Sequence, residues 1–213
     1  NKILEVRKSV AKMLIELKCV QLSPKSPFSY ASGLKGPIYC DNRKLLSHVK
    51  ERSQLWGMWK QQILDLGLKF DLVAGIATAG IPHATALAIA LEKPMIYVRA
   101  QAKAHGKNNQ VEGDYAPEQK CLLIEDLVNQ GSSVRDALRG LSNAKLEATA
   151  CVSIVHYQMK DADDFFRQEK LLLLPLTDFA AILQVAVETK YIGHDEEKLL
   201  LQWQENPKAC RAG

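Results

Sequence analysis

The chain has 213 residues, of which 47% are hydrophobic and 24% are charged. These proportions are typical of a soluble globular protein, and the length fits one α/β domain with a small appendage rather than two full domains. The formal net charge of +4 suits an anionic small-molecule ligand, but it is too small and too dispersed to indicate nucleic-acid binding.

The first third of the chain predicts two helices separated by short strands. Apolar residues recur at helical spacing over 1–19, and a segment rich in serine and proline ends this pattern. Residues 28–41 alternate in polarity around Gly36 and Pro37, which predicts short strands and a turn. A second helix is expected over about 48–66, where a glycine follows.

From residue 71 onward, strands and helices alternate. This order predicts a mostly parallel sheet with helices on both faces, and ligands outside the carboxyl ends of its strands. A long polar loop, about 99–117, interrupts the rhythm. The strands are expected at 71–74, 95–98, 120–125, 147–155 and 171–174, the last of them short and buried. The helices are expected at 81–91, 132–142, 161–168, 178–188 and 195–205.

The segment 121–134 is the most informative in the chain. An apolar strand ends in the adjacent carboxylates of Glu125 and Asp126, and a polar loop containing Gly131 leads into a helix. Free N–H groups at a helix start attract phosphate, and carboxylates accept hydrogen bonds from sugar hydroxyls. The segment therefore predicts a ribose 5-phosphate ligand. The alternative is an ordinary strand-to-helix turn in which both acids are solvated caps.

Two further loops leave the ends of predicted strands. The residues from Gly75 to Gly80 are small, which suits either close approach of a pyrophosphate or close packing of a strand on a helix. The loop 99–113 carries the cationic candidates Arg99, Lys103, His105 and Lys107, which would oppose charge on a departing pyrophosphate. A loop of this length is commonly a functional lid, and a solvated basic loop is the alternative.

The five cysteines are scattered and show no Cys-x-x-Cys spacing. This pattern is typical of reduced thiols, so we expect a cytoplasmic protein without a disulfide framework or a zinc site. Cys121, at the start of a buried strand, is expected to be inert. No apolar run approaches the ~20 residues that a membrane-spanning helix needs. The four histidines considered show no metal-like grouping and are expected on the surface or in the core; they are His48, His83, His156 and His194.

Three segments together resemble the type I phosphoribosyltransferases and, within them, the bacterial orotate phosphoribosyltransferases. The first is the acidic strand-and-loop segment 121–134. The second is Phe28 to Arg43, which resembles the substrate segment of that family, and the third is Arg99 to Gly113, which resembles its mobile catalytic loop. The segments occur in the order and spacing of the family, and the resemblance extends from about residue 27 to about residue 207.

The resemblance implies one phosphoribosyltransferase domain over 1–213, with a type I phosphoribosyltransferase-like, mostly parallel sheet flanked by helices. A small N-terminal hood is expected mainly over 20–45, and a mobile catalytic loop over about 99–117. The implied activity is transfer of the 5-phosphoribosyl group from phosphoribosyl pyrophosphate to orotate, which gives orotidine 5′-monophosphate and pyrophosphate in pyrimidine biosynthesis. Mg²⁺ is the implied cofactor, without dedicated protein ligands. The resemblance also implies a homodimer in which loop 99–113 reaches the partner's site.

The resemblance also assigns residues to roles. Catalysis is expected from Arg99, Lys103, His105 and Asp126. The residues expected to bind phosphoribosyl pyrophosphate are Thr78, Ala79, Arg99, Lys103, His105, Glu125, Asp126, Leu127, Val128, Asn129, Gln130, Gly131, Ser132 and Ser133. Those expected near orotate are Ser32, Gly33, Tyr39 and Asn129. For Lys35, Asp41 and Arg43, a role as ion partners near the subunit interface is an open alternative to substrate binding.

The chain departs from the family pattern at four positions. Ala100 and Gln101 stand where a second lysine is usual, Asn129 replaces a hydroxyl residue, and Gln130 replaces a smaller one. Two alternatives to an orotate enzyme therefore remain. One is a phosphoribosyltransferase for another base, and the other is a catalytically weak regulator that binds the same donor.

Overall fold

The computed structural model describes residues 2–101 and 109–209. Its centre is a six-stranded sheet with the strand order β10-β9-β8-β5-β6-β7. Neighbouring strands run parallel from β10 to β6, and β7 pairs antiparallel with β6. The strands are β5 (Leu72–Ile76), β6 (Met95–Val98), β7 (Val111–Glu112), β8 (Lys120–Val128), β9 (Glu147–His156) and β10 (Leu172–Asp178). The predicted fold class is confirmed.

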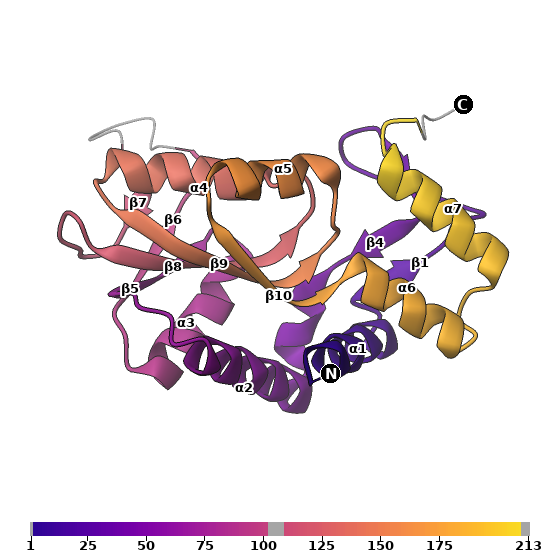
Figure 1. The fold of residues 1–213 in the computed structure, drawn as a ribbon, viewed down its shortest axis with the longest axis horizontal. Coiled ribbons are helices and arrows are strands. Elements are labelled where there is room, and N and C mark those ends of the chain that lie inside the picture. The colour runs from indigo at the N-terminus through magenta and orange to yellow at the C-terminus, as the bar shows by residue number, and fades with distance from the viewer. Residues whose placement is uncertain (1, 102–108, 210–213) are drawn as a thin grey trace.

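Helices cover both faces of this sheet (Figure 1). Helices α4 and α5 lie over one face, and α1, α2 and α3 lie over the other, while α6 and α7 follow β10 beyond the end of the sheet. The helices are α1 (Lys2–Glu16), α2 (Val49–Asp65), α3 (Gly80–Leu91), α4 (Ser132–Asn143), α5 (Lys160–Gln168), α6 (Phe179–Glu188) and α7 (His194–Glu205). Among the described residues, none of these helices is both long and apolar enough to cross a bilayer.

Strand β8 explains why the sheet needs helices on both sides. Its side chains alternate between two apolar clusters, because successive strand residues point to opposite faces. Leu122 and Ile124 pack in the cluster that contains Trp59 of α2. Cys121 and Leu123 pack in the cluster that contains residues of α4 and α5. A strand buried on both faces reads as a continuous apolar run, which is the pattern that made β8 visible in the sequence.

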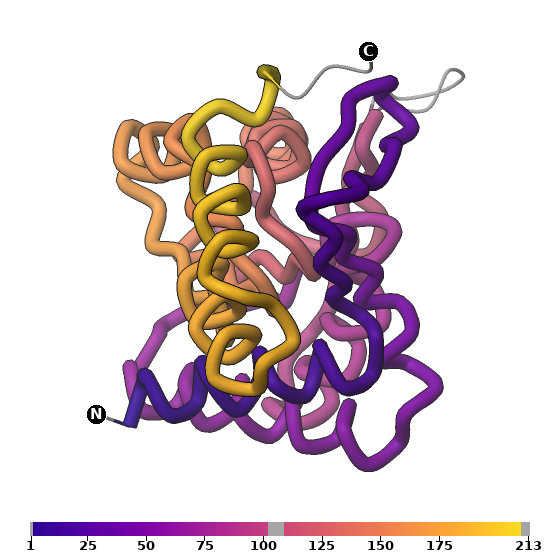
Figure 2. The backbone as a smooth tube through the Cα atoms, turned by 90° about the vertical axis from the view of Figure 1, so that its right-hand side faces the viewer, coloured from indigo at the N-terminus to yellow at the C-terminus, as the bar shows by residue number. Residues whose placement is uncertain are grey.

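The chain between α1 and α2 forms a separate small layer. Strand β1 pairs antiparallel with β4, and β2 pairs antiparallel with β3. In Figures 1 and 2 this layer lies beside α7, next to the main sheet. We call residues 20–47 the hood segment. Its elements are β1 (Val20–Leu22), β2 (Phe28–Ser29), β3 (Lys35–Gly36), β4 (Ile38–Cys40) and the 3₁₀ helix η1 (Asn42–Ser47).

The structure corrects several predicted boundaries. Strand β8 continues to Val128 instead of ending at residue 125, because β9 pairs with it as far as His156. Strand β7 lies inside the expected loop 99–117.

Strand β10 extends to Asp178 through Pro175, which is tolerated because β10 is an edge strand. It is also not buried throughout, as Leu172 is 47% exposed. Strand β1 and helix η1 were not predicted.

Candidate active site

The carboxyl ends of β5, β6 and β8 meet at one edge of the sheet, because β5 pairs in parallel with both neighbours. The three loops singled out in the sequence leave from this edge. They begin at Ala77, Arg99 and Asn129. In parallel α/β sheets this edge is where ligands bind. The structure therefore gathers the three predicted loops on one side of the molecule.

A cavity of about 590 Å³ opens at this edge. It brings together the end of β8, the loop after β5, the first turn of α3 and helix η1 of the hood segment. Of the residues predicted to bind substrate, Thr78, Ala79 and Asp126 line it. The full lining consists of Arg43, Leu46, Thr78, Ala79, Pro82, His83 and Asp126.

The two adjacent acids lie in different environments. Asp126 is half-buried and lines the cavity, whereas Glu125 is only 5% exposed. The Glu125 carboxylate accepts a hydrogen bond from the hydroxyl of Ser133 (2.7 Å) and another from the backbone N–H of Asp126 (2.9 Å). Burial, reinforced by the neighbouring Asp126, raises the pKa of Glu125 to about 8. In this arrangement Asp126 faces the cavity, and Glu125 supports the start of α4.

The loop between β8 and α4, residues 129–131, makes a sharp turn at the glycine that the sequence singled out. Gly131 has a φ of +80°, a left-handed conformation that glycine adopts without a steric penalty, and α4 begins at the next residue. The first N–H groups of a helix have no acceptors within that helix, so they remain available to an anion. Asn129 and Ser132 are exposed beside them. Ser133 donates to Glu125, so its hydroxyl already has a partner in the protein.

Close packing explains the small residues at both ends of the loop after β5. A methyl group added at Gly80 would fall on the carbonyl oxygen of Ile124, and one added at Gly75 would lie 2.9 Å from the β-carbon of Ala84. These two glycines are therefore required by close packing of α3 on the sheet. Thr78 and Ala79 lie between these two glycines and line the cavity. They therefore remain the candidates for pyrophosphate contact.

The candidate cations are placed only in part. Arg99 follows β6, and its Nε donates to the carboxylate of Glu112 on β7 (2.9 Å). Arg99 therefore pairs with an acid of the neighbouring strand and is not among the residues that line the cavity. Lys103 and His105 lie outside the described residues.

The predicted orotate contacts in the hood segment lie apart from the cavity lining. Gly33 forms a turn between β2 and β3 with a φ of +81°, and the Ser32 hydroxyl accepts a hydrogen bond from Leu34 N–H in the same turn. Tyr39 packs against Phe28, with ring centroids 5.7 Å apart. All three predicted residues are exposed, and none of them belongs to the cavity lining.

Sequence reasoning missed Asn42, which joins the hood segment to the acidic strand. Asn42 is 1% exposed, and its amide donates to the backbone carbonyl of Asp126 (3.2 Å). Its side-chain oxygen accepts a hydrogen bond from the thiol of Cys40 (3.4 Å). Nothing in the local sequence indicates this contact, because its partners are 84 positions apart.

Arg43 is an ion partner of Asp41 and also a residue of the cavity lining. Its guanidinium makes a two-pronged ion pair with Asp41, through Nε to Oδ1 at 2.7 Å and through Nη2 to Oδ2 at 3.2 Å. This contact lowers the pKa of Asp41. Arg43 also lines the cavity. It is the cationic member of the cavity lining, on the same wall as Leu46.

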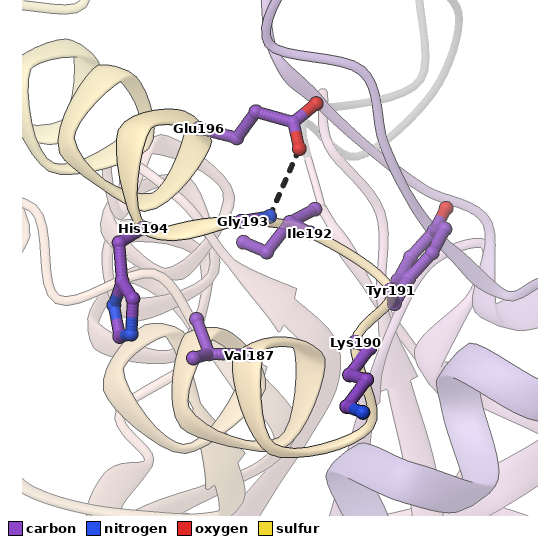
Figure 3. Close-up of a pocket in the computed structure, with 7 residues that line it drawn as sticks. All are labelled: Val187, Lys190, Tyr191, Ile192, Gly193, His194 and Glu196. Carbon is purple, nitrogen blue, oxygen red and sulfur yellow. Dashed lines mark hydrogen bonds between the residues drawn. The ribbon is translucent and has the colours of Figure 1, made fainter.

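A second cavity, of about 430 Å³, lies at the turn between α6 and α7 (Figure 3). All of its lining residues come from one short segment, 187–196. The carboxylate of Glu196 accepts a hydrogen bond from Gly193 N–H (2.9 Å), so it caps α7. The hydroxyl of Tyr191 accepts one from Leu22 N–H of β1 (3.0 Å). These contacts give this turn a structural role, since it holds the hood segment.

The remaining titratable residues considered are histidines and cysteines, for which the sequence predicted no catalytic role. His83 and His156 are buried, whereas His194 is exposed. The four described cysteines are free thiols, and burial raises the pKa of Cys121 to about 12, so this thiol stays protonated. Within residues 2–101 and 109–209, we find no group of three or more His, Cys, Asp or Glu side chains that could hold a metal ion.

Comparisons with known proteins identify the family. A family model described as "Phosphoribosyl transferase domain" matches residues 46–171. The chain is 40% identical to the orotate phosphoribosyltransferase of Coxiella burnetii over 93% of this chain and 95% of that protein. The fold matches orotate phosphoribosyltransferase from Aeropyrum pernix with a TM-score of 0.68 and 24% identity, covering 82% of this chain and 97% of that chain. It also matches the Mycobacterium tuberculosis H37Rv protein of that name in complex with 5-phospho-α-D-ribosyl 1-diphosphate, with a TM-score of 0.64, 20% identity and coverage of 83% and 98%.

The Coxiella relative aligns with nearly the whole chain, and the cavity at the carboxyl edge lies largely inside the segment that the family model covers. The chain therefore belongs to the phosphoribosyltransferase family and, within it, to the orotate phosphoribosyltransferases.

Proposed function

We propose that this protein transfers the 5-phosphoribosyl group from phosphoribosyl pyrophosphate to orotate, as its relatives' names indicate. The bond between the ribose C1 and the pyrophosphate oxygen breaks, and a bond from C1 to a ring nitrogen of orotate forms. The nitrogen loses its proton, and pyrophosphate leaves. The products are orotidine 5′-monophosphate, a precursor in pyrimidine synthesis, and pyrophosphate.

The observation that carries this proposal is the position of Asp126. Its carboxylate lies in the cavity with Thr78 and Ala79, and α4 begins six residues later, at Ser132. A ribose placed against Asp126 can donate its hydroxyls to the carboxylate, while its 5′-phosphate meets the N–H groups at the start of α4. The pyrophosphate then lies toward Thr78 and Ala79. In this placement the ribose, the 5′-phosphate and the pyrophosphate of the donor each face a different part of the site.

Positive charge at the mouth of the cavity would stabilise the leaving group. The ribose carbon gains positive character as the bond breaks, and pyrophosphate gains negative charge. We assign this stabilisation to Arg99, Lys103 and His105 of the loop 99–113. Closure of the loop would also exclude water, which would otherwise hydrolyse the donor. In a homodimer this loop would act in the partner's site.

Magnesium fits the donors that the cavity offers. Carboxylate oxygens are ligands that Mg²⁺ prefers, and it commonly binds through one or two carboxylates together with substrate phosphates. Asp126 supplies such an oxygen, whereas burial and the Ser133 contact keep Glu125 inside the protein. Bound Mg²⁺ would neutralise charge on the departing pyrophosphate. The protein's own part is to orient Asp126 and to present the loop amides.

The base would lie beside Asn129 and the hood segment. Asn129 is exposed in the loop between β8 and α4, where an amide can donate to or accept from a base edge. We assign the remaining base contacts to Ser32, Gly33 and Tyr39 of the hood segment. An Asn129 that favours a different base would make the protein a phosphoribosyltransferase for that base. We place this chemistry in the cytoplasm, where the free thiols would remain reduced.

A spectrophotometric assay with phosphoribosyl pyrophosphate, Mg²⁺ and one base at a time tests the proposal. We expect orotate to be consumed, with formation of one pyrophosphate per orotate, and purine bases to be left unchanged. Consumption of a purine base alone would assign the protein to another base. Donor binding without turnover on any base would make it a regulator, and either result would contradict the proposal.

A further inference from the structure

Helix α2 carries three side chains that reach two walls of the cavity. Arg52, Trp56 and Trp59 are spaced at i, i+4 and i+7, which places them on one face of the helix. The guanidinium of Arg52 lies 5.5 Å from the ring centroid of Trp56, and its Nη1 donates to the carbonyl of Leu46 in η1. Leu46 belongs to the cavity lining. Helix α2 thus fixes the η1 wall through Arg52.

The same helix face holds His83 on the opposite wall. His83 lies in the first turn of α3, is 1% exposed and also lines the cavity. Its ring meets Trp56 and Trp59 edge-on, with centroids 6.2 and 5.7 Å away. The Nε1–H of Trp56 donates to Nδ1 of His83 at 3.0 Å. The two ring contacts and this hydrogen bond together hold the imidazole of His83 in one orientation.

The contact with Trp56 also determines where the imidazole proton lies. A tryptophan Nε1–H can only donate, so Nδ1 of His83 must be unprotonated, and the proton of the neutral ring is on Nε2. Burial lowers the pKa of His83 to about 4, although the nearby Asp126 opposes this shift. The ring is therefore neutral near pH 7. His83 presents a neutral N–H donor, and no described residue accepts a hydrogen bond from it.

A neutral donor suits a cavity that holds both an anionic ligand and a carboxylate. Asp126 needs to stay ionised to accept hydrogen bonds from sugar hydroxyls, and Arg43 already supplies a cation to the lining. The Nε2–H of His83 is therefore available to donate to a ligand oxygen in the cavity that His83 lines. His83 shares the wall of Thr78 and Ala79, where the proposed function places the pyrophosphate.

We propose that His83 is a binding residue that donates Nε2–H to the pyrophosphate group of the donor, and that Trp56 is a positioning residue that fixes the required tautomer. This inference rests on the proposed function, because it takes the pyrophosphate of the phosphoribosyl donor as its ligand. It explains why a buried histidine of the cavity lining is held by a half-buried tryptophan, although neither residue belongs to the sequence motifs of the site.

Two matched variants test the two ring nitrogens of His83 separately: Nε2, which donates toward the cavity, and Nδ1, which accepts from Trp56. In His83→Asn, the side-chain oxygen can replace Nδ1 as the acceptor for Trp56, but no donor reaches the cavity. In His83→Gln, the amide nitrogen can replace Nε2. Isothermal titration calorimetry would measure the binding of inorganic pyrophosphate with Mg²⁺, and of ribose 5-phosphate as a ligand that lacks this group.

We expect His83→Asn to weaken pyrophosphate binding about tenfold, which corresponds to one hydrogen bond to a charged group. Binding of ribose 5-phosphate should stay the same, and His83→Gln should recover most of the lost affinity. Pyrophosphate binding by His83→Asn equal to that of the wild type would overturn this inference alone. Wild-type protein that binds neither ligand would overturn the proposed function as well.

The tautomer can be read without any variant of His83. In ¹⁵N NMR spectra of the wild-type protein, we expect the His83 ring to be protonated on Nε2 from about pH 6 to about pH 8. Trp56→Phe should produce a mixture of tautomers and a severalfold loss of pyrophosphate affinity, since its ring packs in a similar way but cannot donate. A wild-type ring protonated on Nδ1, or a Trp56→Phe variant with unchanged tautomer and affinity, would overturn the inference.

Discussion

The carboxyl edge of the sheet and the hood segment are built by different kinds of contact. At the edge, parallel backbone pairing sets the relative positions of β5, β8 and β9, and the glycines of the loop after β5 fit α3 against this frame. The hood segment has only two-residue or three-residue strands. A few side chains hold it in place, through apolar packing of Ile38 and Leu45 in the core and through hydrogen bonds such as those of Asn42 and Tyr191. A site that needs both regions therefore combines a rigid half with a half that a few side chains position.

The largest effect is expected at the rigid edge, at Asp126. In Asp126→Asn, the side chain keeps its size but loses the negative charge of the carboxylate, which accepts hydrogen bonds from the sugar hydroxyls. We expect kcat/KM for the phosphoribosyl donor to fall about 100-fold or more, in line with the loss of a charged group in a site of this kind. Steady-state kinetics checks this. Asp41→Asn is the control, since Asp41 pairs with Arg43 but does not line the cavity, and a fall as large there would contradict the role of Asp126.

Packing at the same edge can be broken by a single methyl group. Gly80→Ala forces a β-carbon onto the carbonyl oxygen of Ile124, and we expect it to lower the free energy of unfolding by about 2 kcal/mol, as overpacked cores do. Chemical denaturation measures this change. Gly57→Ala is the matched control: Gly57 lies in α2 with nothing near its added β-carbon, so stability should rise by about 0.5 kcal/mol. Equal effects at both glycines would show that close packing does not shape this loop.

The link between the two regions can be cut at Asn42. Asn42→Ala removes the hydrogen bond to the Asp126 carbonyl, and Tyr191→Phe removes the one to Leu22 N–H. Each variant should lose about 1 kcal/mol of stability. Only Asn42 contacts β8, the strand that carries Asp126. We therefore expect kcat/KM to fall roughly tenfold in Asn42→Ala and to stay near the wild-type value in Tyr191→Phe. Equal activity in both variants would mean that the hood is joined to the site in another way.

The smallest effect is a pH dependence of stability at Glu125. Its pKa is raised from the ordinary value of 4.5 to about 8 in the folded protein. The folded state therefore binds more protons than the unfolded state between these two values, and the free energy of unfolding decreases as pH rises through this window. Glu125→Gln cannot titrate, so denaturation curves from pH 5 to pH 8 should show a weaker pH dependence than the wild type. An identical slope in both proteins would show that Glu125 titrates normally.

The same contrast explains what could be predicted from the sequence. The apolar run before Glu125 marks a buried strand because its side chains alternate between two clusters, and Gly131 marks the turn because its φ is positive. These signals are local. The extra length of β8 could not be read from its own residues, because pairing with β9 as far as His156 determines where it ends.

Residues that act across the sequence left no local signal. Asn42 contacts Asp126 from 84 positions away, and Trp56 contacts His83 from 27 positions away. A single asparagine in a turn, or a tryptophan on an amphipathic helix, reads as an ordinary surface or core residue. The pairing of Arg99 with Glu112 was missed for a related reason: it depends on β7, a two-residue strand too short to produce a pattern.

A crystal structure of the protein with ribose 5-phosphate bound tests the central claim most directly. We predict that the ribose hydroxyls contact the carboxylate of Asp126 and that the phosphate contacts the backbone N–H groups between Asn129 and Ser133. A ribose 5-phosphate that binds elsewhere, with the β8–α4 turn empty, would contradict the account.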